Sequence, residues 1–190
     1  MTIEPAGGDD PAPAPTHLLA GDLSGNVSQL RVEHPAALGS NFEDSAGRYL
    51  LGVPSEPSAP YSQGIWFVDP ANGRSSLNLP ELPNGWAYEG WVVTENGPIS
   101  TGRFTDLMSA DSDGAGPAAG PIAGPPFPGQ DFVNPALDLI GTTVVISIEP
   151  EPDNSPAPFT LKPLIDEVDD AGAHGIQGLR NMARDANPRG

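Results

Sequence analysis

Carboxylates are the side chains of this 190-residue sequence that offer the most chemistry, because it has 25 Asp and Glu, three His and no Cys. Asp106, Asp111 and Asp113 lie within one loop-like stretch, and clustered oxygens are the ligands that Ca²⁺ prefers. Their spacing departs from the EF-hand pattern, since Gly114 comes too early and no glutamate follows at the twelfth position. We therefore expect a solvated acidic loop, with a calcium site as the alternative.

Other catalytic and metal-binding patterns are weak. His17, His34 and His174 are far apart and lack the carboxylate spacing of a zinc site. The absence of cysteine excludes disulfides, thiolate catalysis and Cys-zinc sites. No G-x-S-x-G motif occurs. The carboxylate pair of a glycosidase is defined in space rather than in sequence, so a carbohydrate-active enzyme with an acidic pair remains an alternative. The sequence favours a protein that is not an enzyme and has no cofactor.

Three tryptophans, Trp66, Trp86 and Trp91, fall on neighbouring expected strands. If exposed, they would form a surface on which carbohydrate rings stack. Large aromatic side chains in apolar surroundings are more often core residues, and we expect that here.

A second candidate binding element is the proline-rich stretch 117–128 (PAAGPIAGPPFP), which lies in a long Gly/Pro/Ala/Asp interruption. A polyproline-type strip could dock a partner with Ile122 and Phe127 as anchors. Alternatively, Phe127 packs onto its own sheet.

The element that positions these residues is a β-hairpin over residues 86–104, with aromatic and β-branched arms around Asn96-Gly97. A two-residue loop would place Trp91 opposite Gly102. One more loop residue would instead place Glu89 opposite Arg103 as a cross-strand ion pair.

Short apolar segments separated by Gly/Pro turns recur along the chain, the clearest being residues 142–148 (TTVVISI). This pattern predicts an all-β protein with a single antiparallel β-sandwich over residues 17–165. We expect residues 1–16 to be a proline-rich N-terminal segment and residues 166–190 to be an acidic linker and flexible tail.

The net charge of −17, with 8 basic residues, predicts repulsion from nucleic acids and anionic membrane surfaces. No apolar run reaches the roughly 20 residues of a membrane-spanning helix, so direct membrane insertion is not expected. No signal peptide is visible.

The two ends share a pattern at a constant offset of 145 residues. The matched segments are Ile3-Glu4-Pro5 with Ile148-Glu149-Pro150, Pro11-Ala12-Pro13 with Pro156-Ala157-Pro158, and Leu19 with Leu164. Two interpretations stay open: a tandem repeat, so that the first 16 residues end a preceding unit, or coincidence in a proline-rich chain. In a repeat, the spare N-terminal strand would join a sheet of its own domain or of a neighbouring copy.

Three segments resemble the extracytoplasmic C-terminal domain of anti-sigma-K-type factors: 79–85 (LPELPNG), 97–104 (GPISTGRF) and 148–158 (IEPEPDNSPAP). The resemblance covers about residues 64–165. It implies an all-β domain outside the cytoplasmic membrane, which that family joins through one transmembrane helix to a sigma-binding domain. This chain shows neither of those two parts, so only the β-module carries over, without catalytic residues.

Taken with the missing catalytic motifs, the resemblance predicts a non-enzymatic, extracytoplasmic binding module. Its expected partner is a protein or a neighbouring copy of the chain. The alternatives are a structural repeat of a surface or filament protein, and a carbohydrate-active enzyme.

Overall fold

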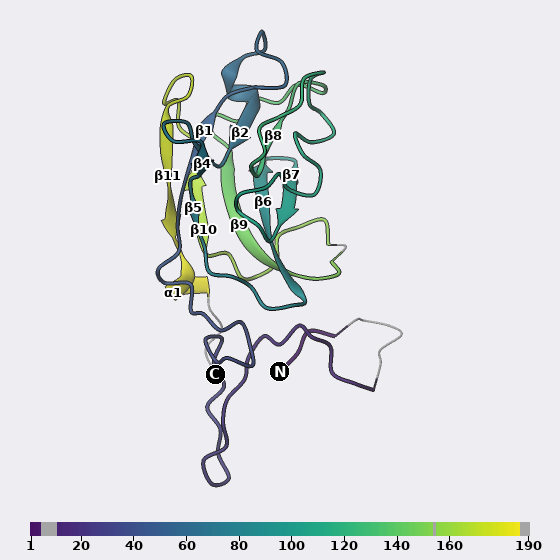
Figure 1. Ribbon diagram of the computed structural model, residues 1–190, viewed down its shortest axis with the longest axis vertical. Coiled ribbons are helices and arrows are strands. Elements are labelled where there is room, and N and C mark those ends of the chain that lie inside the picture. Colours follow the sequence, from purple (N-terminus) through teal and green to yellow (C-terminus); the bar gives the residue numbers. More distant parts are fainter. Residues whose placement is uncertain (5–10, 154, 187–190) are drawn as a thin grey trace.

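The computed structural model describes residues 1–4, 11–153 and 155–186, and they are almost entirely strands and loops (Figure 1). The short helical elements are η1 (Tyr61–Gln63) and α1 (Ala183–Ala186). The strands are β1 (Ala46–Leu51), β2 (Gly64–Trp66), β3 (Val68–Asp69), β4 (Arg74–Ser75), β5 (Leu77–Asn78), β6 (Trp86–Thr94), β7 (Gly97–Phe104), β8 (Gly129–Asp131), β9 (Thr143–Pro150), β10 (Leu164–Glu167) and β11 (Ile176–Asn181).

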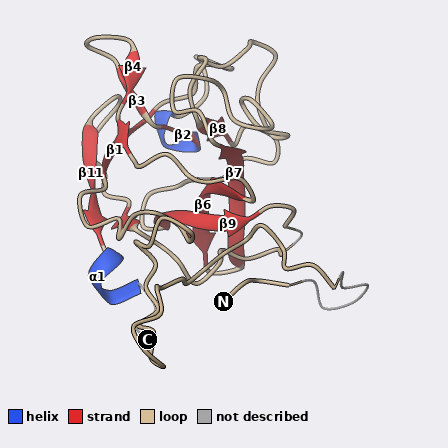
Figure 2. Cartoon of the chain, turned by 60° about the horizontal axis from the view of Figure 1, so that its bottom comes forward, coloured by secondary structure: helices blue, strands red, loops and turns tan. Residues whose placement is uncertain are grey.

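One antiparallel sheet runs in the order β7-β6-β9-β10-β11-β1-β2-β8, and β5 also pairs with β1. The strands β3 and β4 form a separate pair. The sheet curves so far that its two end strands, β7 and β8, approach each other (Figure 2). The inner face of this nearly closed sheet encloses one apolar core. This confirms the expected all-β, sandwich-like class.

The long hairpin of β6 and β7 contains the Glu89–Arg103 pair of the second predicted register, but its loop begins one residue earlier than predicted. Its loop is Glu95-Asn96, because Thr94 pairs with Gly97. Beyond Trp91, which lies opposite Ser100, the register shifts by one residue. The extra residue is on β7. The expected placement of Trp91 over Gly102 is therefore wrong.

This β-bulge produces the predicted ion pair by another route. Between the pairs Trp91–Ser100 and Glu89–Arg103, β6 has one residue, Gly90, and β7 has two, Thr101 and Gly102. Gly102 has a φ of 101°, which favours glycine. The bulge turns Arg103 onto the same face as Glu89.

The expected flexible tail contains a strand of the main sheet. β11 pairs with β1 and β10, and Gln177 joins this layer through its side chain. It accepts a hydrogen bond from the Tyr49 hydroxyl (3.2 Å) and donates one to the Asp169 carbonyl (2.9 Å). The predicted end of the domain at residue 165 is thus too early. The glycines in this segment weaken a helix, but they do not prevent an extended strand. β11 is such a strand, and β1 and β10 cover its two edges. The last residues of the predicted tail, 187–190, lie outside the described residues.

The N-terminal segment lies beyond one end of the sheet, at the bottom of Figure 1. Thr2 pairs with His17 in an isolated bridge, and the buried Leu18 donates its N–H to the Met1 carbonyl (2.9 Å). Residues 148–150, by contrast, belong to β9 in the middle of the sheet. Within the described residues, the two segments matched at the 145-residue offset therefore have different structural positions. Pro5 lies outside the described residues.

An arm extends from this end of the molecule (Figure 1). Bridges between Ala20 and Arg31 and between Ser24 and Val27 hold residues 20–31 as an irregular hairpin. Leu23 and Val27 are 78% and 71% exposed. The arm thus presents apolar side chains to solvent.

Candidate functional site

The main polar cluster surrounds Arg103 of β7, where β6, β7, β9 and the turn after β9 meet. The guanidinium contacts three carboxylates: Nε lies 2.9 Å from Glu89 Oε2, Nη1 lies 3.1 Å from Glu151 Oε1, and Nη2 lies 3.1 Å from Asp153 Oδ2. Glu89 and Asp153 are largely buried, whereas Glu151 is 43% exposed. One base therefore holds three separate segments of the chain together.

Glu149 is the innermost carboxylate of this cluster and is fully buried on β9. Its Oε1 accepts hydrogen bonds from the Ser147 hydroxyl and from the Phe159 N–H (2.8 Å). Its Oε2 is also buried and has no hydrogen-bond partner among the residues that the structure describes. Burial raises the pKa of Glu149, these two hydrogen bonds oppose the shift, and the charges of Glu89 and Asp153 add to it.

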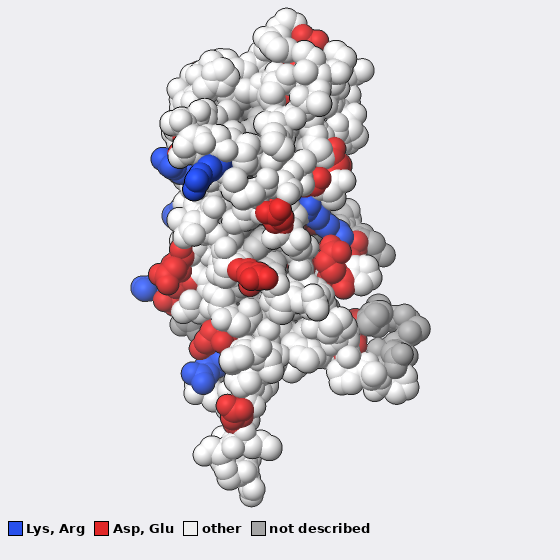
Figure 3. Space-filling view, in the orientation of Figure 1, with Lys and Arg blue, Asp and Glu red and all other residues white. Residues whose placement is uncertain are grey.

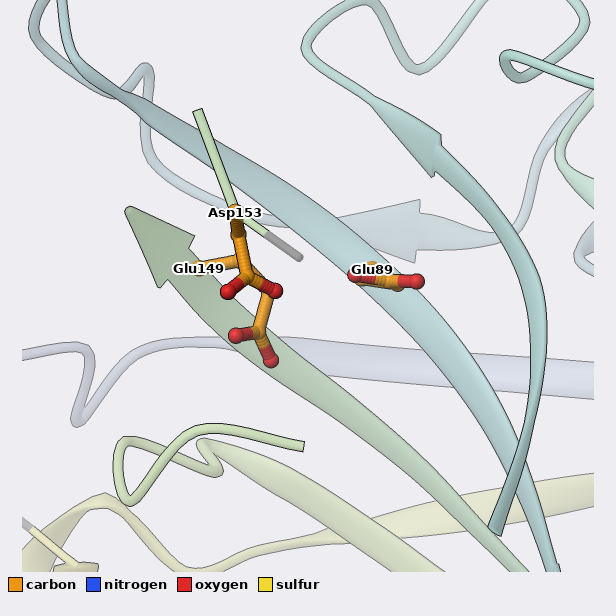
Figure 4. A group of neighbouring side chains, drawn as sticks. All are labelled: Glu89, Glu149 and Asp153. Carbon is orange, nitrogen blue, oxygen red and sulfur yellow. The ribbon is translucent and has the colours of Figure 1, made fainter. Parts of the chain in front are cut away.

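The carboxylates of Glu89, Glu149 and Asp153 come together from two strands and a turn (Figure 4). One oxygen of each lies within 4.8 Å of one oxygen of each of the others. A group of three or more His, Cys, Asp or Glu side chains can share one metal ion when its ligand atoms lie this close together. In the described part of the chain, these three carboxylates form such a group.

A groove of about 490 Å³ opens beside Arg103, lined in part by Glu89, Ser100, Asp113 and Glu151. Acidic side chains outnumber basic ones on the face shown in Figure 3, and the area at its upper end is largely uncharged. The groove itself has an acidic lining, with the Ser100 and Ser112 side chains beside the carboxylates.

A carboxyl pair, Asp111 and Asp113, lies at one side of this groove. Asp111 Oδ2 accepts a hydrogen bond from the Gly129 N–H (2.9 Å), which joins the loop to β8. Burial raises the pKa of Asp111 to about 7, the bond from Gly129 opposes this shift, and the charge of Asp113 adds to it. The pair fits against Gly102, where a Cβ would lie 2.6 Å from Asp113 Oδ1.

The calcium triad, which was the alternative interpretation of this loop, does not form among the described residues. Asp106 is exposed and accepts hydrogen bonds from the Met108 N–H (2.9 Å) and the Ser109 hydroxyl (2.5 Å) of its own turn. Only Asp111 and Asp113 of the three lie together, because the turn at Asp106 directs its side chain into local bonds. The predicted solvated loop is also wrong for Asp111, which is 9% exposed.

His17 and His34 both contact Ala36, whose N–H donates to His34 Nδ1 (3.1 Å), so these two histidines lie near each other despite their spacing in the sequence. His17 Nδ1 lies 2.8 Å from the Ala36 carbonyl, and His34 lies 3.5 Å from an Asp22 carboxylate oxygen. His174 lines a second, mainly apolar hollow of about 670 Å³, together with several prolines and Tyr61.

The aromatic candidates are core residues. Trp66, Trp86 and Trp91 are 1–2% exposed, so none offers a ring face to a sugar. Phe127 is also buried, whereas Ile122 is 53% exposed. A docking strip that uses both anchors is therefore not formed, because Phe127 is buried.

Sequence reasoning identified the Glu89–Arg103 pair but missed Glu149, Glu151 and Asp153 as its neighbours. A signal exists in the strand alternation: Ser147 and Glu149 share one face of β9, and the apolar Ile146 and Ile148 share the other. The sequence alone does not reveal that β9 pairs with β6. This pairing places Glu89 opposite Ser147.

Comparison of the chain with models of known families, with curated proteins and with solved structures gave no match. In the described part of the chain, no helix has the length and apolar character required to cross a membrane.

Proposed function

We propose that this chain is a non-enzymatic binding module that acts outside the cytoplasm and recognises a basic group of a protein partner. The observation that carries the proposal is the groove beside Arg103, where Glu89, Asp113 and Glu151 present carboxylates from three segments. Arg103 already contacts three carboxylates, so the groove keeps an excess of negative charge.

The geometry of the carboxylates favours binding over glycoside hydrolysis. A general acid must reach the glycosidic oxygen of its substrate. Glu149 and Asp111, two carboxyl groups with a raised pKa, are both buried, and Arg103 holds Glu89 and Asp153 in ion pairs. No tryptophan lines the groove.

Two sequence properties support the choice of partner and location. The net charge of −17 attracts basic surfaces at long range, which raises association rates. The resemblance of residues 64–165 to the extracytoplasmic domain of anti-sigma-K-type factors supports a role outside the membrane.

The proposal is tested by NMR titration with the capped peptide Gly-Arg-Gly and with its citrulline analogue, which has the same shape but no charge. We expect the arginine peptide to shift the Arg103 Nε–H resonance and the backbone amides of Ser100 and Ser112, and the citrulline peptide to have little effect. Glu151→Gln should weaken this response, whereas Glu167→Gln, an exposed change on β10, should not. Shifts scattered over the acidic surface, or equal shifts with citrulline, would exclude a specific groove.

The arm of residues 20–31 favours a second candidate function, assembly with copies of the same chain. Leu23 and Val27 are exposed on an extended segment that projects from the molecule, and such segments tend to find another surface. Light scattering over a concentration series should then show oligomers that disappear in a Leu23→Ser, Val27→Ser double variant but persist in Ile122→Ser. A monomeric wild type at all concentrations eliminates this candidate.

A further inference from the structure

We propose that Glu89, Glu149 and Asp153 form a calcium site beneath the acidic groove. This inference goes beyond the proposed function: it shares Glu89 with the groove, but it concerns a metal ion held by the buried carboxylates and not the partner that the groove accepts.

The spacing of the three carboxylates suits one calcium ion. Ca²⁺ binds oxygen at about 2.3–2.6 Å, so ligands on opposite sides of the ion are about 4.6–5.2 Å apart. The three oxygens here lie within 4.8 Å of one another, so one ion can contact all of them. Mg²⁺ binds at about 2.0–2.1 Å in strict octahedral geometry and loses water reluctantly, which makes it the poorer fit.

Glu149 gives the independent indication of a ligand. Its side chain is fully buried, and within the described ranges its Oε2 has no hydrogen-bond partner. The charges of Glu89 and Asp153 both act on this carboxylate, which lies beside that of Asp153 in Figure 4. A buried acceptor without a donor is costly unless a proton or a cation satisfies it.

The local charge also permits a divalent ion. Four carboxylates, those of Glu89, Glu149, Glu151 and Asp153, carry −4, and Arg103 carries +1, which leaves −3. A calcium ion would change this sum to −1, so it would not create an excess of positive charge. Arg103 contacts one oxygen each of Glu89 and Asp153, and Glu149 has no ion pair in the described part of the chain.

A tryptophan reports directly on this site. The Trp91 Nε1–H donates to Ser147 Oγ (2.8 Å), and the Ser147 hydroxyl donates to Glu149 Oε1. An ion bound to the Glu149 carboxylate would change the strength of both hydrogen bonds. The Trp91 indole N–H resonance should therefore move when calcium binds.

The test uses the full chain, first stripped with a chelator and then titrated with CaCl₂ over about 0.1–10 mM, the range of weak extracellular calcium modules. MgCl₂ and NaCl at the same ionic strength control for general screening of the −17 charge. The readouts are the Trp91 indole N–H resonance and the melting temperature. The variants are Glu149→Gln and Asp153→Asn, and the matched control is Glu167→Gln at an exposed position.

We expect a saturable shift of the Trp91 resonance and a higher melting temperature with calcium in the wild type and in Glu167→Gln. Glu149→Gln and Asp153→Asn should each bind at least about tenfold more weakly. The proposal is overturned if the wild type shows no saturable shift, or if Glu149→Gln responds as the wild type does. In those cases a proton satisfies the Glu149 oxygen. Equal binding of Mg²⁺ would overturn the assignment to calcium.

Discussion

Replacing Arg103 by methionine tests whether this base holds the acidic cluster together. The change keeps a long aliphatic side chain but removes the charge that Glu89, Glu151 and Asp153 share. Because the side chains of Glu89 and Asp153 are only 5% and 10% exposed, water cannot fully hydrate these carboxylates once the guanidinium is gone.

The structure sets the expected loss of stability. Breaking a buried ion pair by removing one partner costs about 3–5 kcal/mol, because an uncompensated charge stays buried. The Arg103 side chain is 26% exposed and Glu151 is 43% exposed, so solvent screens part of the interaction. We therefore expect the lower end, about 3 kcal/mol. For a chain of this length, each kcal/mol lowers the melting temperature by about 2–4 °C, which gives about 6–12 °C.

Urea unfolding and calorimetry in the presence of a chelator measure this loss. Arg48→Met is the matched control, because the Arg48 side chain is 54% exposed and its contact with Asp69 is 3.5 Å long. Such a surface pair contributes less than about 1 kcal/mol. If both variants lose the same small amount, the carboxylates around Arg103 are effectively solvated and the reasoning about this cluster is wrong.

Three further predictions concern other parts of the fold. Gly102→Ala should lower the free energy of unfolding in urea by about 2–4 kcal/mol, because φ is positive there and the added methyl group meets the Asp111 carboxyl. The control Gly178→Ala, whose Cβ would meet no described atom within 4 Å, should change it by no more than about 0.5 kcal/mol. Equal effects of the two changes would contradict this prediction. Since the pKa of Asp111 is raised to about 7 in the folded state from about 3.9 in the unfolded chain, its contribution to stability is present below about pH 4 and is lost as the pH rises to about 7. Asp111→Asn should therefore reduce the fall in stability over this range by up to about 1.4 kcal/mol per pH unit, and an unchanged pH profile of the urea midpoint would refute it. Deleting residues 1–22 should lower the melting temperature because it removes Leu18 from the core, and an unchanged value would show that this segment does not pack there.

The sequence alone determined the strands whose local signals are strong. Residues 142–148 are apolar and β-branched, and residues 86–104 carry two β-forming arms around Asn96, so both formed strands as predicted, although the loop is Glu95-Asn96 and not Asn96-Gly97. These signals are local, since side-chain alternation and turn chemistry depend on neighbours in the chain. The all-β class and the absence of Cys chemistry follow from the sequence in the same way.

Only the tertiary structure decided which strands lie side by side. β11 completes the sheet between β10 and β1 although its sequence is rich in polar residues and glycine, because covered edges stabilise a segment with little strand propensity of its own. The bulge at Thr101 and Gly102 moved Arg103 opposite Glu89, and the pairing of β6 with β9 brought Glu149 to the same place. The acidic cluster arises from contacts between residues up to 64 positions apart, from Glu89 to Asp153, and sequence spacing carries no measure of such distances.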